Sequence, residues 1–204
     1  MSRTLDFWFD FSSPYAYLAS TQIDGIAART GATLRWRPML LGAVFKQVGQ
    51  VDVPMLAANE AKQRHYLLDM RRWADFYGVP FQFPATFPIR SLLPLRTFLA
   101  HPDPVPFAHA VFRAAWGEGR DITDPDVLRA CGAPDDALAA APDRKQALAD
   151  STAEAVAAGV FGAPTCIVDG RWLFWGQDRL DMVEKCLGGW VPPAVQPPFI
   201  ARAT

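Results

Sequence analysis

The residues with the clearest chemical use follow the first predicted strand. Residues 5–11 place apolar side chains at every second position, which predicts a β-strand. Ser13 then takes the N-cap position of a predicted helix, and Pro14 its first turn, where the missing N–H of proline costs nothing. The Ser13 hydroxyl therefore lies at the positive end of a helix dipole, a place that can hold an anion.

Two interpretations of Ser13 stay open on this basis. The side chain is either only an N-cap or also a hydrogen-bond donor to a bound thiolate. The spacing of Ser13, Pro14, Tyr15 and Ala16 after a strand resembles the Cys-Pro-x-Cys segment of thioredoxin-like proteins. Because neither redox cysteine is present, this segment cannot exchange disulfides.

The composition narrows the possible classes of protein. With 204 residues the chain is long enough for one or two domains with a real core. Its formal net charge of -1 gives no reason to expect nucleic acid or an anionic membrane as a partner. The uncharged residues 155–168 are too few, and too interrupted by glycine and proline, to span a bilayer. The first residues lead directly into a strand, so we expect no secretory signal.

The cysteines and histidines show no metal-ligand spacing. The three cysteines are far apart and odd in number, which favours free thiols in a reducing cytoplasm. The histidines form no paired motif. We therefore expect a cytoplasmic protein without a metal; the residues concerned are Cys131, Cys166, Cys186, His65, His101 and His109.

The elements around Ser13 predict a βαβ unit followed by helices. A helix is predicted over 14–29, with Gly31 just beyond its end, and a second strand over 33–37. The helical crossover between them, a βαβ connection, makes the two strands parallel. Further helices are predicted at 39–48, 55–77, 92–100, 107–116, 125–131 and 143–158.

The last part of the chain predicts a ββα unit. Residues 165–169 and 172–175 read as antiparallel strands, because Asp169-Gly170 between them suits a type I′ turn. Asp178 is the predicted N-cap of a last helix over 179–187.

This order predicts an α/β fold of the thioredoxin-like type. The all-helical insertion between the βαβ and ββα halves resembles the DsbA-like branch of that superfamily. We predict a thioredoxin-like domain at 1–40 plus 159–190, a helical insertion domain at 41–158, and a Pro-rich C-terminal tail at 191–204.

Four segments carry a narrower resemblance. They read FDFSSPYAYL at 9–18, AWGEGRDI at 115–122, GVFGAPT at 159–165 and FWGQDRL at 174–180. Together they resemble 2-hydroxychromene-2-carboxylate isomerases and the related kappa-class glutathione transferases. The resemblance runs from about Leu5 to Leu187, and Cys166 departs from it where an apolar residue is expected.

The resemblance implies a glutathione site. Ser13 would hold the thiolate, and the helix N-terminus with one hydrogen bond can lower a thiol pKa by roughly one to a few units. Ala163-Pro164 matches the cis-proline of the superfamily, whose neighbouring backbone pairs with the cysteinyl part of glutathione. Gln177 and Asp178 match positions that take its γ-glutamyl end. The expected cofactor-binding residues are Ser13, Pro14, Tyr15, Ala163, Pro164, Trp175, Gln177 and Asp178.

The resemblance also implies a pocket for an aromatic carboxylate. The best matches for its polar contacts are Lys46, Asn59 and Arg90, each of which is otherwise an ordinary surface residue. Aromatic residues either wall this pocket or belong to the core: Trp8, Trp36, Phe81, Phe83 and Phe87.

The function implied is glutathione-dependent isomerisation between 2-hydroxychromene-2-carboxylate and trans-o-hydroxybenzylidenepyruvate, as in naphthalene and other aromatic hydrocarbon catabolism. Addition of a thiolate turns the double bond into a single bond that can rotate, which replaces one high barrier by two lower ones. One alternative is a kappa-like transferase or peroxidase acting on electrophiles. Another is a non-catalytic thioredoxin-like binding module. A homodimer is also expected from the resemblance.

Overall fold

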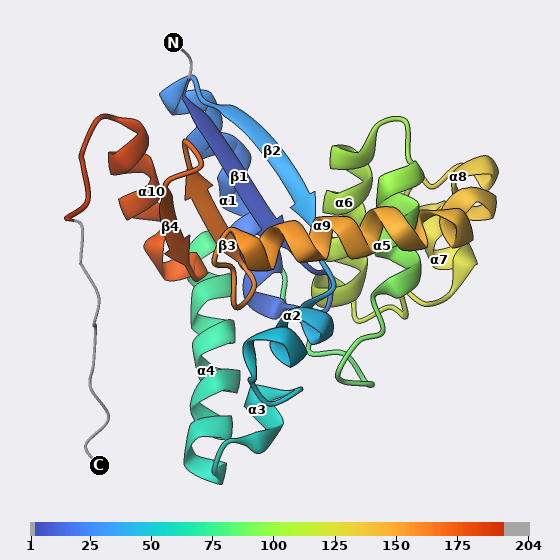
Figure 1. The fold of residues 1–204 in the computed structure, drawn as a ribbon. Helices are drawn as coiled ribbons and strands as arrows, with labels where there is room; N and C mark the ends of the chain where they lie inside the picture. Colours follow the sequence, from blue (N-terminus) through green and yellow to red (C-terminus); the bar gives the residue numbers. More distant parts are fainter. Residues whose placement is uncertain (1–2, 194–204) are drawn as a thin grey trace.

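The computed structural model describes residues 3–193, and its centre is a four-stranded sheet in the order β2-β1-β3-β4 (Figure 1). β1 (Thr4–Phe9) pairs parallel with β2 (Thr33–Pro38) and antiparallel with β3 (Thr165–Val168). β3 pairs antiparallel with β4 (Trp172–Trp175). The predicted parallel pair and the predicted hairpin are both confirmed, and Asp169 and Gly170 have the positive φ angles of a type I′ turn.

β1 is central because both of its faces are buried. Phe7 and Phe9 are fully buried on one face, where Phe9 meets Phe98 edge-on at 5.2 Å between ring centroids. Trp8 points to the other face and packs in a second cluster with Ala155. Strands covered on both sides need such continuous apolar runs.

Helix α1 (Pro14–Thr30) covers the first face together with α10 (Leu180–Leu187), and α9 (Lys145–Ala157) crosses the opposite face (Figure 1). The predicted caps of α1 are confirmed. Ser13 Oγ accepts from the Ala16 N–H at 3.1 Å, and Gly31 ends the helix at φ 66°.

The predicted helical block is confirmed, with shifted boundaries and with one helix, at 135–140, that was not predicted. The π-helical turn Arg113–Gly117 follows α6, and the 3-10 turn Ala141–Arg144 precedes α9. One hydrophobic cluster joins the block to the sheet, so the two-domain division stays a prediction. The helices are α2 (Leu41–Val48), α3 (Pro54–Ala57), α4 (Glu60–Tyr77), α5 (Leu92–Ala100), α6 (Pro104–Phe112), α7 (Pro125–Ala130) and α8 (Asp135–Ala140).

Two local predictions are wrong. The single helix expected over 55–77 is broken, because the Asn59 side chain accepts from the Lys62 N–H and starts a new helix. Asp178 does not cap the last helix: it lies in the 3-10 turn Gln177–Arg179, where it forms an ion pair with Arg179. Most of the predicted Pro-rich tail, from residue 194 onward, lies outside the described residues.

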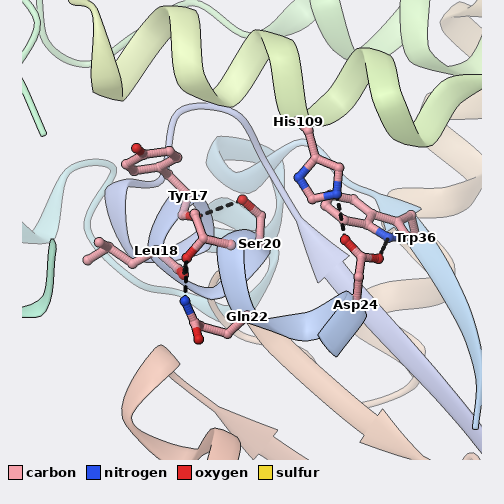
Figure 2. Close-up of polar contacts among 8 residues, drawn as sticks. Tyr17, Leu18, Ser20, Gln22, Asp24, Trp36 and His109 are labelled. Carbon is pink, nitrogen blue, oxygen red and sulfur yellow. Dashed lines mark hydrogen bonds and ion pairs between the residues drawn. The ribbon is translucent and has the colours of Figure 1, made fainter. Parts of the chain in front are cut away.

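A polar cluster ties the helical block to the βαβ unit (Figure 2). His109 Nε2 on α6 lies 2.6 Å from Asp24 Oδ2 on α1, and Trp36 Nε1 on β2 donates to Asp24 Oδ1 at 3.4 Å. The His109 ring also packs edge-on against Trp36 at 4.9 Å. The consecutive elements α1 and β2 and the distant α6 therefore meet at Asp24.

Candidate functional site

A cavity of about 890 Å³ lies at the end of the sheet where β1, β2 and β4 end and β3 begins. The segments that follow β1 and β2, together with the loop before β3 and the end of β4, all contribute to it. α4 and the start of α5 close its other sides. The lining is mostly apolar with a few polar groups, which is typical of a small-molecule site.

Ser13 lies in this cavity with its hydroxyl already engaged. The side chain is 4% exposed, and its Oγ donates to the Ala163 carbonyl at 2.9 Å while accepting from the Ala16 N–H. The Ala163-Pro164 peptide bond is cis, as expected. To donate to a ligand, the Ser13 proton has to leave the Ala163 carbonyl.

The structure brings part of the predicted cofactor site together. Ser13, Pro14, Tyr15, Ala163 and Trp175 all line the cavity. The lining does not include the other three predicted residues. Gln177 is buried and Asp178 is paired with Arg179; the third is Pro164.

Only one of the three predicted substrate-binding residues lines the cavity. Arg90 lines the cavity, but Lys46 and Asn59 do not. Lys46 is exposed on α2, and the preceding residue, Phe45, faces the cavity instead. The Asn59 side chain is used as the N-cap of α4. Lys62 on α4 does line the cavity, and no pattern in the sequence distinguishes it from the other cations of that helix.

The predicted aromatic wall is mostly core. Phe87 lines the cavity, whereas Trp8 and Trp36 are buried in the two hydrophobic clusters. Phe81 and Phe83 pack against the indole of Trp116 at 6.2 and 5.9 Å between ring centroids. Trp116 Nε1 in turn donates to the Phe11 carbonyl at 2.8 Å, which supports the turn that carries Ser13.

The cavity carries charges of both signs. Lys62 and Arg90 form no ion pair with any residue in the described part of the chain. Asp52 and Asp10 also line the cavity; Asp52 is exposed, whereas Asp10 is 1% exposed. Two cations at a mostly apolar cavity suit a ligand that combines carboxylates with an apolar body.

Asp10 was not predicted as a site residue. Its Oδ1 accepts from the Ser12 N–H at 2.8 Å, and its Oδ2 accepts from the Leu41 N–H at 2.7 Å. Burial raises the pKa of the Asp10 carboxyl group, and hydrogen bonds from Leu41, Ser12 and Ser91 oppose that rise. In the sequence Asp10 looks like any polar residue at the end of a strand.

Tyr15 links the cavity to α4. Its hydroxyl donates to Asp69 Oδ2 at 2.9 Å. Burial, and next the hydrogen bond to Asp69, raise the pKa of the Tyr15 phenol, so it stays protonated at neutral pH. Tyr15 therefore acts as a fixed wall between α1 and α4.

The thiols are not placed to act as nucleophiles. All three cysteines are buried and free. Burial raises the pKa of Cys166, two residues beyond the cis-proline, to about 12, so it carries almost no thiolate at neutral pH. In the described residues no group of three or more His, Cys, Asp or Glu side chains could hold a metal, and no helix is long and apolar enough to cross a membrane.

Gly162 sets the position of Trp175 at the mouth of the cavity. A Cβ at residue 162 would lie 2.6 Å from Trp175 Nε1, closer than real contacts allow. We expect Gly162→Ala to move the Trp175 ring and to weaken ligand binding at least tenfold. A tenfold loss of affinity corresponds to about 1.4 kcal/mol of binding free energy. Titration followed by Trp fluorescence measures this. Gly188→Ala, outside the cavity lining and with a Cβ that would make only ordinary contacts at 3.4 and 3.5 Å, is the control, and equal affinities for both variants would contradict the prediction.

Comparison with known proteins agrees with this geometry. Residues 4–188 match the family model described as a DSBA-like thioredoxin domain. A 2-hydroxychromene-2-carboxylate isomerase of Sphingobium xenophagum is 34% identical over 195 residues, covering 92% of this chain and 99% of the relative. Human glutathione S-transferase kappa 1 is 27% identical, covering 96% and 97%.

A solved structure supports the same placement. The structure of a 2-hydroxychromene-2-carboxylate isomerase superposes with a TM-score of 0.80 at 29% identity, covering 91% of this chain and 94% of the other. The resemblance noted in the sequence is thus confirmed across nearly the whole chain. The chain belongs to the DSBA-like thioredoxin domain family, in the group that contains the 2-hydroxychromene-2-carboxylate isomerases.

Proposed function

We propose that this protein is a glutathione-dependent isomerase that interconverts 2-hydroxychromene-2-carboxylate and trans-o-hydroxybenzylidenepyruvate. The observation that carries the proposal is Ser13, a buried hydroxyl at the N-terminus of α1, facing a cavity that the cationic side chains of Lys62 and Arg90 also line. Relatives named as this isomerase at up to 34% identity support it.

The residues at this edge fit glutathione. Bound there, glutathione supplies a thiol nucleophile for reversible addition to a conjugated double bond. Ser13 donates its hydroxyl proton toward the sulfur position, and the α1 dipole favours negative charge there. The Ala163 carbonyl, released by Ser13, accepts an amide N–H of the ligand. Lys62 or Arg90 attracts a carboxylate.

The same cavity fits an aromatic carboxylate beside glutathione. Leu41, Phe45 and Phe87 provide an apolar wall for the ring. Whichever of Lys62 and Arg90 does not hold glutathione is free to hold the carboxylate of the second molecule. The volume of about 890 Å³ lies in the upper part of the range for ligand cavities, as two ligands require.

Turnover with and without glutathione tests the proposal. The substrate absorbance is expected to change rapidly only when glutathione is added at millimolar concentration. Glutathione sulfonate, which keeps the peptide but lacks the thiol, is the matched control and is expected to inhibit. Equal rates with and without glutathione would remove the thiol step from the mechanism.

Two other functions make different predictions. A kappa-like transferase or peroxidase, favoured by the 27% identity to the human kappa enzyme, would conjugate a chlorinated nitroarene or reduce a hydroperoxide. A binding module without activity would show no turnover and no thermal shift with glutathione.

A homodimer, a cytoplasmic location and a role in aromatic hydrocarbon catabolism belong to the proposal as well. Sedimentation at several concentrations tests the dimer.

A further inference from the structure

Asp10 is a buried carboxylate in the lining of the cavity, and the proposed function assigns it no role. It follows β1 immediately, at the edge of the sheet where the cavity opens, and it is 1% exposed. A buried carboxylate is costly unless hydrogen bonds compensate, and such groups are often found where proton transfer is needed.

The hydrogen bonds to Asp10 come from the cavity wall. Besides the backbone N–H groups of Ser12 and Leu41, the hydroxyls of Ser12 and Ser91 lie close enough to Asp10 to lower the pKa of its carboxyl group. Ser12 and Ser91 also line the cavity. A hydroxyl that donates to Asp10 keeps lone pairs with which it can accept a proton from a ligand. Ser12 and Ser91 thus connect the cavity to the carboxylate.

The other ionisable groups at the cavity are arranged differently. Asp52, Lys62 and Arg90 are exposed to water rather than buried. Tyr15 is committed to Asp69, and Tyr66 lies beside Lys62, whose Nζ is 5.7 Å from its ring. Of the carboxylates that line the cavity in the described chain, Asp10 is the one shielded from water.

Building on the proposed function, we propose that Asp10, acting through the hydroxyls of Ser12 and Ser91, carries the proton that opening of the chromene ring requires. The C2 hydroxyl of the hemiketal gives its proton through a serine to Asp10. The C2–O1 bond breaks, C2=O forms, and the electron pair goes to the aryl oxygen. That oxygen then takes the proton back from Asp10, so the step is balanced without a further reactant.

The test compares two substrates in wild type and Asp10→Asn. One is 2-hydroxychromene-2-carboxylate, which must open. The other is cis-benzylidenepyruvate without the ortho hydroxyl, which cannot form the ring and needs no such proton transfer. Because Asn can accept only one of the two backbone N–H bonds that Asp10 accepts, both substrates are expected to slow somewhat. We expect Asp10→Asn to lower kcat for the chromene about 100-fold more than kcat for the open substrate, the usual range for a lost acid–base group.

A pH profile gives a second readout. Asp10 has to be ionised to accept the proton, so wild-type kcat for the chromene should fall as pH drops through the pKa of Asp10, which burial raises above the ordinary range. That acidic limb should be absent in Asp10→Asn and absent for the open substrate.

A purely structural role of Asp10 predicts that the two substrates respond alike. Because Asp10 also holds the starts of α1 and α2 in place, a structural loss would slow both substrates equally, and that result would overturn the inference. If Asp10→Asn does not fold, Ser91→Ala decides by the same criterion. Thr97→Val is its control, a buried hydroxyl on the same helix that donates to the Leu93 carbonyl away from the cavity.

The inference and the proposed function fail separately. If the wild type isomerises both substrates and the variants slow neither, or slow both by the same factor, only the role of Asp10 is overturned. If the wild type isomerises neither substrate with glutathione present, both are overturned.

Discussion

Replacing Ser13 with alanine is expected to lower glutathione-dependent kcat by a factor of about 10²–10³, the usual loss when one donor to a developing negative charge is removed. The hydroxyl is the side-chain donor at the N-terminus of α1, and nothing at Ala16 replaces it. Unfolding free energy should fall by about 1 kcal/mol, the typical cost of a lost N-cap, and further because the Ala163 carbonyl loses its donor. Steady-state kinetics and urea unfolding measure the two effects.

Two variants separate chemistry from capping. Asp124→Ala removes another N-cap that is followed by proline, with a side-chain bond of 2.8 Å to the Asp126 N–H, and should change stability but not turnover. Ser13→Thr keeps the hydroxyl and should recover most of the activity. Turnover of Ser13→Ala at the wild-type rate would show that Ser13 is only a cap.

Replacing Trp116 with alanine is expected to cost about 3–5 kcal/mol of unfolding free energy, as for other buried tryptophans. Trp116 is fully buried in the π-helical turn after α6, and Phe81, Phe83 and Phe87 pack around it. The substitution also leaves the Phe11 carbonyl without its donor. Chemical denaturation measures the loss of unfolding free energy as a lower midpoint at an unchanged m-value.

A milder variant isolates the hydrogen bond. Trp116→Phe keeps an aromatic ring but removes the Nε1 donor, so it should cost about 1–3 kcal/mol. Because Phe11 lies between Asp10 and Ser12, KM for glutathione should rise as well. Trp190→Ala, at an indole that is 41% exposed, should stay within about 0.5 kcal/mol of wild type. A stability equal to wild type in Trp116→Ala would contradict the packing described here.

The fold could be predicted well because its signals are local. Period-2 alternation marked β1, the serine–proline pair marked the start of α1, and Asp169-Gly170 marked the hairpin. The break between α3 and α4 was missed because Asn59 sits in a sequence whose helical periodicity continues through it. Capping competes with periodicity there, and the cap wins.

The candidate site was predicted only in part, because helix phase decides which side chain faces a cavity. Lys46 and Phe45 are neighbours on α2, yet only Phe45 turns inward. Lys62 was overlooked for the same reason: its orientation depends on where α4 begins. Asp10 shows the other limit, since its partners Leu41 and Ser91 are distant in sequence and meet it only in the folded chain.

The bond between Ser13 Oγ and the Ala163 carbonyl has a consequence for ligand selectivity. A thiolate that accepts the Ser13 hydrogen bond leaves the carbonyl oxygen without a partner, and such a loss costs about 1–3 kcal/mol when water is shut out. A peptide thiol repairs the loss with its own amide N–H, whereas a simple alkyl thiol cannot. The pair would thus discriminate among cellular thiols by requiring sulfur and amide in the same molecule.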